Sequence, residues 1–418
     1  MNTHSLLSLA WRNLWRQKRR TILTLISIAF GGFLAVMMTG TQDYTWVDFI
    51  DTTARLGSGH IAVQHPEYQD KPTLTRTVTE TDAKRRAVDT DPAVAVAVER
   101  TTGQAMVATA KDSFGAFFIA YDPTQESEYT LEWTQGLVAG TLFETPDDDG
   151  IILGQALAEN LDAQLGDKVV YTLTDRQGEI VSGMERLSGI ITTGAQSTDA
   201  ALVLMPLNPV REVIGYDGTE STQVAIFLNN GRRTLTVSER IAELIGPGAA
   251  VLTWDQLQPE IKTFIAMKKG GGIVMNVVIG ILVAAGIFNT LFMSVMERTR
   301  EFGIMLAIGY SPRQLFALVM LESGILATLG LALCVGVTSP LYIHLSKNGL
   351  DLSEAYAQQG LDTLDIGGIG FDPVMPFGIF PESGAAIAGA IFLATMLAGV
   401  YPAFRAGRVN PIASINLV

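Results

Sequence analysis

The chain is poor in the residue types that build disulfides, metal centres and densely charged surfaces. It has one cysteine, Cys334, so no internal disulfide can form, and a domain outside the cytosol must depend on its own hydrophobic core. Cys334 lies in an apolar stretch, where we interpret it as a small buried hydrophobic residue. The histidines do not have the spacing of a zinc site; they are His4, His60, His65 and His344. Charged residues make up 17% of the 418 positions, against about 25% in an average soluble domain. This composition predicts that parts of the chain lie in lipid.

Sequence motifs for hydrolysis and for nucleotide binding are also missing. The chain has no Gly-x-Ser-x-Gly nucleophile elbow. It has no Gly-Lys dipeptide, and therefore no phosphate-binding loop of the Gly-x-x-x-x-Gly-Lys-[Ser/Thr] type. We therefore expect no enzyme activity and no cofactor in this chain, and if ATP drives the protein, a partner must bind the ATP and its Mg²⁺. The net charge of −13 is a poor match for nucleic acid.

Four apolar segments are long enough to cross a membrane, since a spanning helix needs about 20 apolar residues. They are 21–45, with an uncharged stretch at 21–40, then 270–296, 312–345 and 384–404. The third is interrupted by Glu322 and Pro340. No small-x-small cleavage site follows the first segment, so we interpret it as an uncleaved signal anchor.

The distribution of charge predicts how the spans are oriented. The stretches before the first span, between the second and third, and after the fourth carry ten basic and two acidic residues. The segment 41–269 carries 18 basic and 33 acidic residues, and the loop 346–383 carries one and six. Because basic residues mark the cytosolic side, we expect both termini in the cytosol of a bacterium, with the large segment and the loop 346–383 in the periplasm.

The segment 46–265 is long enough for a domain of its own, and its pattern is mixed α/β. A helix is expected over 155–164, ended by Gly166–Asp167. Strands are expected at 60–64, 168–174, 187–192, 201–205 and 223–228. The predicted fold is four transmembrane α-helices with a large mixed α/β extracytoplasmic domain inserted between helices 1 and 2.

The first 20 residues predict an amphipathic helix that lies on the cytosolic membrane surface. Leu7, Trp11, Leu14 and Trp15 fall on one face, with basic residues opposite. Anchoring in the interface of the membrane explains the tryptophans without a ligand.

The loop between the second and third spans, 297–311, carries the most informative sequence. We expect a short helix over 298–308, with Gly309 as its C-cap and Ser311–Pro312 starting the next helix. Phe302, Met305 and Leu306 give the short helix an apolar edge. Its arginines are compatible with anchoring to anionic headgroups, and the same segment is compatible with docking in a groove on a partner.

This loop, ERTREFGIMLAIG followed by SPRQL, resembles MacB/LolC/LolE/FtsX-type permeases, also called type VII ABC transporters. The opening NLWRQKRRTILTLISIAFGG, the segment GQALAENL…GDKV at 154–169 and the tail YPAFRAGRVNPIASI are similar to the same family. The resemblance implies that this loop forms a coupling helix, which is the helix that lies on the ATPase. The residues for which it implies this role are Glu297, Arg298, Arg300, Glu301, Phe302, Gly303, Met305, Leu306 and Gly309. Many members carry a basic residue at the position of Leu306.

Within this family, the strings GSGHIAV at 57–63 and WDQLQPE at 254–260 look most like LolC and LolE. The resemblance implies a periplasmic core with a subdomain inserted at about 115–215, and a dimer of permeases on a dimer of ATPases. It also implies a lipoprotein or lipid-like cargo, and leaves room for a periplasmic acceptor. Two rival functions stay open: MacB-like efflux of peptides or hydrophobic compounds, and an FtsX-like signalling scaffold that transports nothing.

Two features within the spans attract attention. Glu322 is a carboxylate at shallow depth in the third span. Two roles stay open for it: packing between helices or subunits, and a place on a path for substrate or protons. Gly31, Gly32 and Ala35 permit close approach of another helix to the first span, and we expect a helix-packing interface there.

Overall fold

The computed structural model describes residues 3–127, 129–358, 364–366, 369–371 and 373–409. Parts of the predicted loop 346–383 and of the predicted tail 405–418 therefore lie outside the described residues. The chain divides into two compact units. A helical unit comprises 1–45, 266–350 and 375–418, and an α/β unit comprises 46–265 and 351–374.

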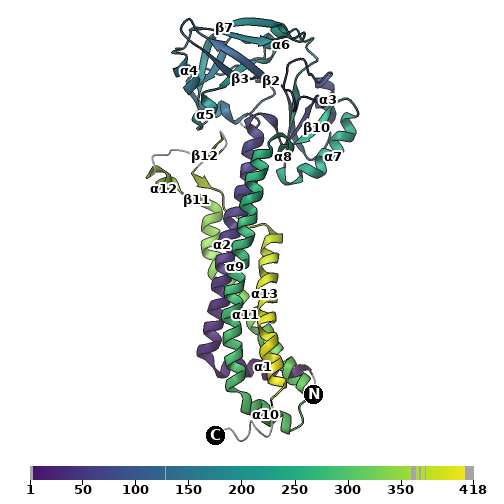
Figure 1. Ribbon diagram of the computed structural model, residues 1–418, viewed down its shortest axis with the longest axis vertical. Coiled ribbons are helices and arrows are strands. Elements are labelled where there is room, and N and C mark those ends of the chain that lie inside the picture. Colours follow the sequence, from purple (N-terminus) through teal and green to yellow (C-terminus); the bar gives the residue numbers. More distant parts are fainter. Residues whose placement is uncertain (1–2, 128, 359–363, 367–368, 372, 410–418) are drawn as a thin grey trace. The chain divides into compact units, whose positions relative to one another are not determined.

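The helical unit confirms the prediction of four long apolar helices, the first near the N-terminus (Figure 1). Its helices are α1 (Thr3–Arg16), α2 (Lys18–Thr53), α9 (Pro259–Glu297), α10 (Thr299–Ala307), α11 (Pro312–Asn348) and α13 (Pro381–Gly407). The last turns of α2 and the first turns of α9 belong to the α/β unit. With 39 residues, α9 is about 58 Å long. This length exceeds the hydrocarbon core of about 30 Å. The sequence predicted only the apolar part of the helix, 270–296, and not its extension to Pro259.

Helix α11 runs without interruption through both residues that interrupt its apolar pattern, Glu322 and Pro340. It starts as expected, with Ser311 as N-cap and Pro312 at the first position. Gln314 completes a capping box, because its side chain accepts from the Ser311 N–H while Ser311 Oγ accepts from the Gln314 N–H. The rigid start fixes the direction in which α11 leaves the loop.

The glycine pair of α2 packs against helices of the same chain. A Cβ on Gly31 would lie 2.2 Å from Val283 Cγ2 of α9, and a Cβ on Gly32 would lie 2.5 Å from Cys334 Sγ of α11. Ala35 is half-buried. Glycine thus lets α2 approach two neighbouring helices more closely than any larger residue would.

The N-terminal helix is shorter than predicted, and its buried face differs from the predicted one. It ends at Arg16, and residues 18–20 begin α2. Leu7, Trp11 and Trp15 are exposed, as a membrane-facing edge requires, whereas Leu14 is buried. Leu14 belongs to a second stripe, with Leu6 and Ala10, that faces the other helices. A small residue such as Ala10 gives no amphipathic signal, which is why this second stripe was missed.

The α/β unit combines sheet and helices, as predicted. The elements of its first half are η1 (Ala54–Ser58), β1 (Ile61–Gln64), α3 (Thr81–Val88), β2 (Val94–Ala108), β3 (Ser113–Tyr121), η2 (Glu132–Gly136), β4 (Leu137–Gly140), β5 (Ile151–Gly154) and α4 (Gln155–Asn160). Those that follow are β6 (Lys168–Thr174), β7 (Ile180–Ile191), α5 (Gln196–Asp199), β8 (Leu202–Pro206), α6 (Leu207–Ile214), β9 (Gln223–Leu228), η3 (Gly231–Arg233), α7 (Thr234–Ile245), β10 (Ala250–Thr253) and α8 (Trp254–Leu257). Nearer the C-terminus lie β11 (Leu350–Asp351), α12 (Ser353–Ala357), β12 (Leu364–Ile366), β13 (Ile369–Phe371) and β14 (Val374–Met375).

The long strand β2 joins the two parts of the main sheet. Its first half pairs with β9, which pairs with β1 and then β10. Its second half pairs with β3 and β6, and the path continues through β8, β5, β7 and β4. The subdomain that the family resemblance places at 115–215 thus corresponds to β3–α6, and it shares one hydrogen-bonded sheet with the rest of the unit.

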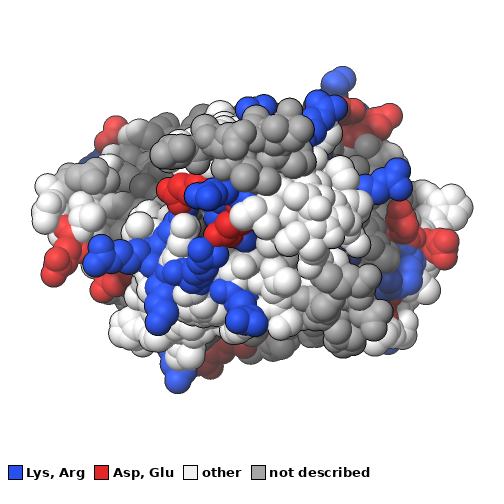
Figure 2. Space-filling view, turned by 90° about the horizontal axis from the view of Figure 1, so that it is seen from below, with Lys and Arg blue, Asp and Glu red and all other residues white. Residues whose placement is uncertain are grey.

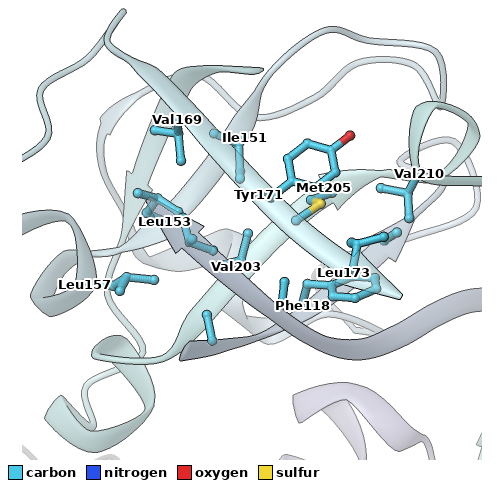
Figure 3. Packing of buried hydrophobic residues seen from close by; sticks show 14 of the residues in the cluster. Phe118, Ile151, Leu153, Leu157, Val169, Tyr171, Leu173, Val203, Met205 and Val210 are labelled. Carbon is cyan, nitrogen blue, oxygen red and sulfur yellow. The ribbon is translucent and has the colours of Figure 1, made fainter. Parts of the chain in front are cut away.

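Each part of the sheet has its own core. One cluster gathers around β1, β9, α3 and α7 and includes Ile61, Ile226 and Ile241. The other lies among β2, β3 and β5–β8 and includes Phe118, Leu153 and Val203 (Figure 3). Strands β8 and β9 are buried on both faces along their whole length, which explains their continuous apolar sequences.

We predict that Gly32→Leu destabilises the helical unit, because the new side chain must displace Cys334 and Ile391. Overpacking of this kind costs about 1–3 kcal/mol, so the unfolding temperature in detergent should fall by several degrees. The matched control is Gly336→Leu on α11, where a Cβ meets nothing within 4 Å. Equal unfolding temperatures for the two variants would contradict the packing of α2 described above.

Candidate functional site

The loop between α9 and α11 forms a compact helical corner at one end of the helical unit, where α1 also lies (Figure 1). The structure places α10 at Thr299–Ala307, within the predicted 298–308. Gly309 has φ +105° and ends the helix. Its N–H donates to Leu306 O at 3.1 Å, and the Tyr310 N–H donates to Met305 O at 3.0 Å. These two bonds form a Schellman motif, which glycine at this position favours.

A buried ion pair ties the corner to the third span. Arg298 Nη1 donates to both carboxylate oxygens of Glu322, at 3.1 and 3.2 Å. Asn13 Nδ2 of α1 donates to the same carboxylate at 2.8 Å. Arg298 also donates from Nε to Glu301, and its guanidinium lies 5.1 Å from the centre of the Phe302 ring. Glu322 thus lies in a contact between helices of its own chain, and three segments far apart in sequence meet at it.

Two ion pairs nearer the surface hold the N-terminal segment to the corner. Arg16 contacts Glu301 at 2.6 Å, and Arg20 contacts Glu297 at 2.9 Å. Gln17 donates to Glu297 at 3.2 Å. Exposed pairs of this kind contribute up to about 1 kcal/mol each, so they orient the N-terminal segment more than they stabilise it.

The inner face of α10 is apolar and packed. Phe302 is fully buried, in a cluster that includes Ala10, Leu315, Leu318 and Ala403. Met305 and Leu306 are half-buried and pack against the same cluster. Gly303 is buried as well. The edge formed by Phe302, Met305 and Leu306, for which the family resemblance implies a role on the ATPase, therefore faces the protein's own helices.

The outer face of α10 carries a different set of side chains. Ile304 is 42% exposed and Ile308 is 75% exposed. Arg300, Ala307 and Gly309 are also exposed. Ile304 and Ile308 are four positions apart and thus lie on one side of the helix. We call the exposed set of Arg300, Ile304, Ala307, Ile308 and Gly309 the outer ridge. The two isoleucines were missed because the sequence makes both sides of α10 apolar.

The nine residues for which the family resemblance implies a role on the ATPase divide into three groups. Glu297, Arg300 and Gly309 are exposed. Glu301, Met305 and Leu306 are half-buried, and Arg298, Phe302 and Gly303 are buried. Arg298, Phe302 and Gly303 therefore pack inside the corner. Figure 2, seen from the end that carries the corner, shows one group of neighbouring Lys and Arg side chains with a few acidic side chains among them, and further basic side chains toward the rim.

These features define a class of protein: a multi-pass membrane protein with a large α/β domain after its first span and a helical corner between its second and third spans. Residues 21–244 match the MacB-like periplasmic core domain, and residues 273–411 match the FtsX-like permease C-terminal region. The chain belongs to the MacB/FtsX family of ABC transporter permeases.

Individual relatives are distant but cover most of the chain. The lipoprotein-releasing system transmembrane protein LolC of Xylella fastidiosa is 24% identical over 78% of this chain and 79% of its own length. An uncharacterized ABC transporter permease of Methanocaldococcus jannaschii is 21% identical over 100% of this chain and 98% of its own. The pyoverdine export ATP-binding/permease protein PvdT of Pseudomonas entomophila is 24% identical over 98% of this chain and 59% of its own.

Among solved structures, the periplasmic region of MacB from Actinobacillus actinomycetemcomitans is similar over 50% of this chain and 94% of its own. The sequence identity is 14% and the TM-score is 0.35.

We predict that the Arg298–Glu322 pair behaves as a unit in a double-mutant cycle. Removing one partner of a buried pair leaves an uncompensated charge and costs about 3–5 kcal/mol, whereas replacing both with apolar residues is often close to neutral. Glu322→Leu and Arg298→Met should therefore each lower the unfolding temperature more than the double variant does. Additive losses, measured by thermal unfolding in detergent, would contradict the pairing. Arg19→Met, which changes an exposed arginine, is the control.

Proposed function

We propose that this chain is the permease subunit of an ATP-driven transporter in the inner membrane of a bacterium, and that it works as a dimer on a separate ATPase dimer. Membership of an ABC permease family supports the need for an ATPase. The proposal of a separate ATPase is supported by the sequence of this chain, which contains no phosphate-binding loop. Some relatives, such as PvdT, are ATP-binding/permease proteins in one chain.

In this proposal the helical corner and both termini lie in the cytosol. The support is the excess of basic residues in the stretches before the first span, between the second and third spans, and after the fourth. The α/β unit, with its acidic excess, then lies in the periplasm.

The single observation that carries the proposal is the outer ridge of α10. Two isoleucines with an arginine beside them lie on a side of the helix that the described residues leave uncovered, and they form the kind of surface that inserts into a groove on a partner. Because Ile304 and Ile308 are exposed toward water in the cytosolic orientation, their burial by the ATPase would be favourable.

In this proposal, the contacts within the corner would transmit a movement of the ATPase to the transmembrane helices. Arg298 ties α10 to Glu322 of α11 and, through Glu322, to Asn13 of α1. A closing ATPase dimer would therefore move the corner as one body. Helix α9 continues from the corner to Pro259 in the α/β unit, where Ile261 and Ile265 pack against α2 residues Phe49 and Ile50. These two helices would carry the movement to the periplasmic side.

For the cargo, we propose a lipoprotein or a lipid-like molecule, which the α/β unit would release or hand to a periplasmic acceptor. The support is the LolC relatives, whose names describe a lipoprotein-releasing system. The alternative is efflux, supported by the PvdT relatives that match nearly the whole chain. An acylated protein bound to detergent-purified permease would favour lipoprotein release. Lack of any stimulation of the ATPase by lipid or lipoprotein would favour a scaffold without transport.

We predict that Ile308→Asp weakens association with the ATPase, alone and more strongly with Ile304→Asp. Loss of one buried isoleucine costs about 1.5–3 kcal/mol, or about a tenfold to hundredfold loss of affinity. The measurement is the amount of ATPase chain that co-purifies with the permease, together with transport. The unfolding temperature of the permease should not change, because both side chains are exposed.

The matched control is Leu235→Asp on α7, which exchanges a leucine of the α/β unit whose exposure, 68%, lies between those of Ile304 and Ile308. It should leave ATPase recovery unchanged. Full recovery of the ATPase with the double variant at 304 and 308 would refute docking on the outer ridge.

A further inference from the structure

An open apolar groove runs along the helical unit between α1, α11 and α13. Its volume is about 720 Å³, which is within the range of small-molecule sites. The walls are formed by Leu7 and Trp11 of α1, Leu321 and Ile325 of α11, and Phe392 and Met396 of α13. Ser8 supplies the polar atoms at the α1 end, and Gly324 leaves the space between α11 and α13 open.

The length and position of the groove fit one leaflet of a bilayer. It follows α11 from Met320 to Leu329, which is about 14 Å at 1.5 Å per residue, or about half of a 30 Å hydrocarbon core. Trp11 borders it at one end and packs edge-to-face against Trp15, with ring centres 5.9 Å apart. Tryptophan pairs of this kind sit at the level of the lipid headgroups. The groove therefore starts at the headgroups and runs toward the middle of the membrane.

The charge at the headgroup end is positive. No acidic residue occurs before Asp43 in the chain. Arg16 is already engaged by Glu301. Among the described residues, by contrast, the Arg12 guanidinium has no ion-pair or hydrogen-bond partner, and Arg12 is exposed. It follows Ser8 by one helical turn, and side chains on a helix lean toward its N-terminus. Helix geometry thus places Arg12 next to Ser8 on α1, at the end of the groove that Ser8 and Trp11 border.

We propose that this groove binds an anionic phospholipid from the leaflet in which α1 lies, with an acyl chain between α11 and α13 and the phosphate on Arg12. The charge of the α1 end favours a lipid over the helix of a second copy. The inference rests on the membrane location of the helical unit and is independent of the transport function proposed above.

The test is native mass spectrometry of the purified full-length permease with equal amounts of phosphatidylglycerol and phosphatidylethanolamine added. Gly324→Leu should fill the groove and weaken lipid retention about tenfold, because several buried methylene groups of the lipid lose their contacts. Gly324→Ala is the matched control, since its Cβ meets only Met396 Sδ, at 3.7 Å. Thr328→Phe fills the groove from its far end and gives a second variant if Gly324→Leu does not fold.

Arg12→Gln should reduce the preference for phosphatidylglycerol about fivefold, which is what one basic residue near an anionic membrane surface contributes. Binding of phosphatidylethanolamine should remain. Arg19→Gln changes an exposed arginine of the same basic stretch that lies on α2 and not on α1, and it should keep the preference.

Equal lipid retention by the wild type and by both groove-filling variants would overturn the proposal. So would a preference for phosphatidylglycerol that survives Arg12→Gln. If Gly324→Leu separates permease dimers and leaves lipid retention unchanged, the groove is a contact between copies and the proposal is likewise wrong.

Discussion

The buried ion pair between Arg298 and Glu322 is the interaction on which the helical unit most depends. Both side chains are at least nine-tenths buried, and a charge removed from water is tolerated only when a partner and hydrogen bonds replace the lost hydration. Glu322 therefore requires Arg298, which in turn fixes where α10 begins. Asn13 brings α1 to the same point. A carboxylate that looks out of place in an apolar span is the centre around which the corner is built.

This constraint explains why the two sides of α10 have different roles. Arg298 and Phe302 hold the inner side against the bundle, so the outer side with Ile304 and Ile308 is presented at a fixed angle. A force applied to the outer ridge cannot rotate α10 by itself, because rotation would expose Phe302 and separate the ion pair. The corner, α1 and the start of α11 must move together. The proposed lipid groove lies along two of these helices, α1 and α11, so a bound lipid would contact the same body that we propose the ATPase moves.

The fold was largely predictable, because its strongest determinants are local. Apolar runs located the four spans, and alternation located β6 at Lys168–Thr174 as predicted. The contacts of the site were not predictable, because they join distant residues. Glu322 meets Arg298 from 24 positions away and Asn13 from 309. Periodicity makes both Phe302–Leu306 and Ile304–Ile308 apolar edges of one helix, and the packing of α1, α11 and α13 decides which of them is buried.

The most direct test of docking on the outer ridge is photo-cross-linking in cells with a benzophenone amino acid in place of Ile308 or Leu306. Ile308 lies on the outer ridge, and Leu306 is half-buried and packs against the bundle. We predict a strong cross-link from position 308 to a nucleotide-hydrolysing chain and a much weaker one from position 306. A strong cross-link from 306 with none from 308, or no nucleotide-hydrolysing chain at either position, would contradict the proposed docking face.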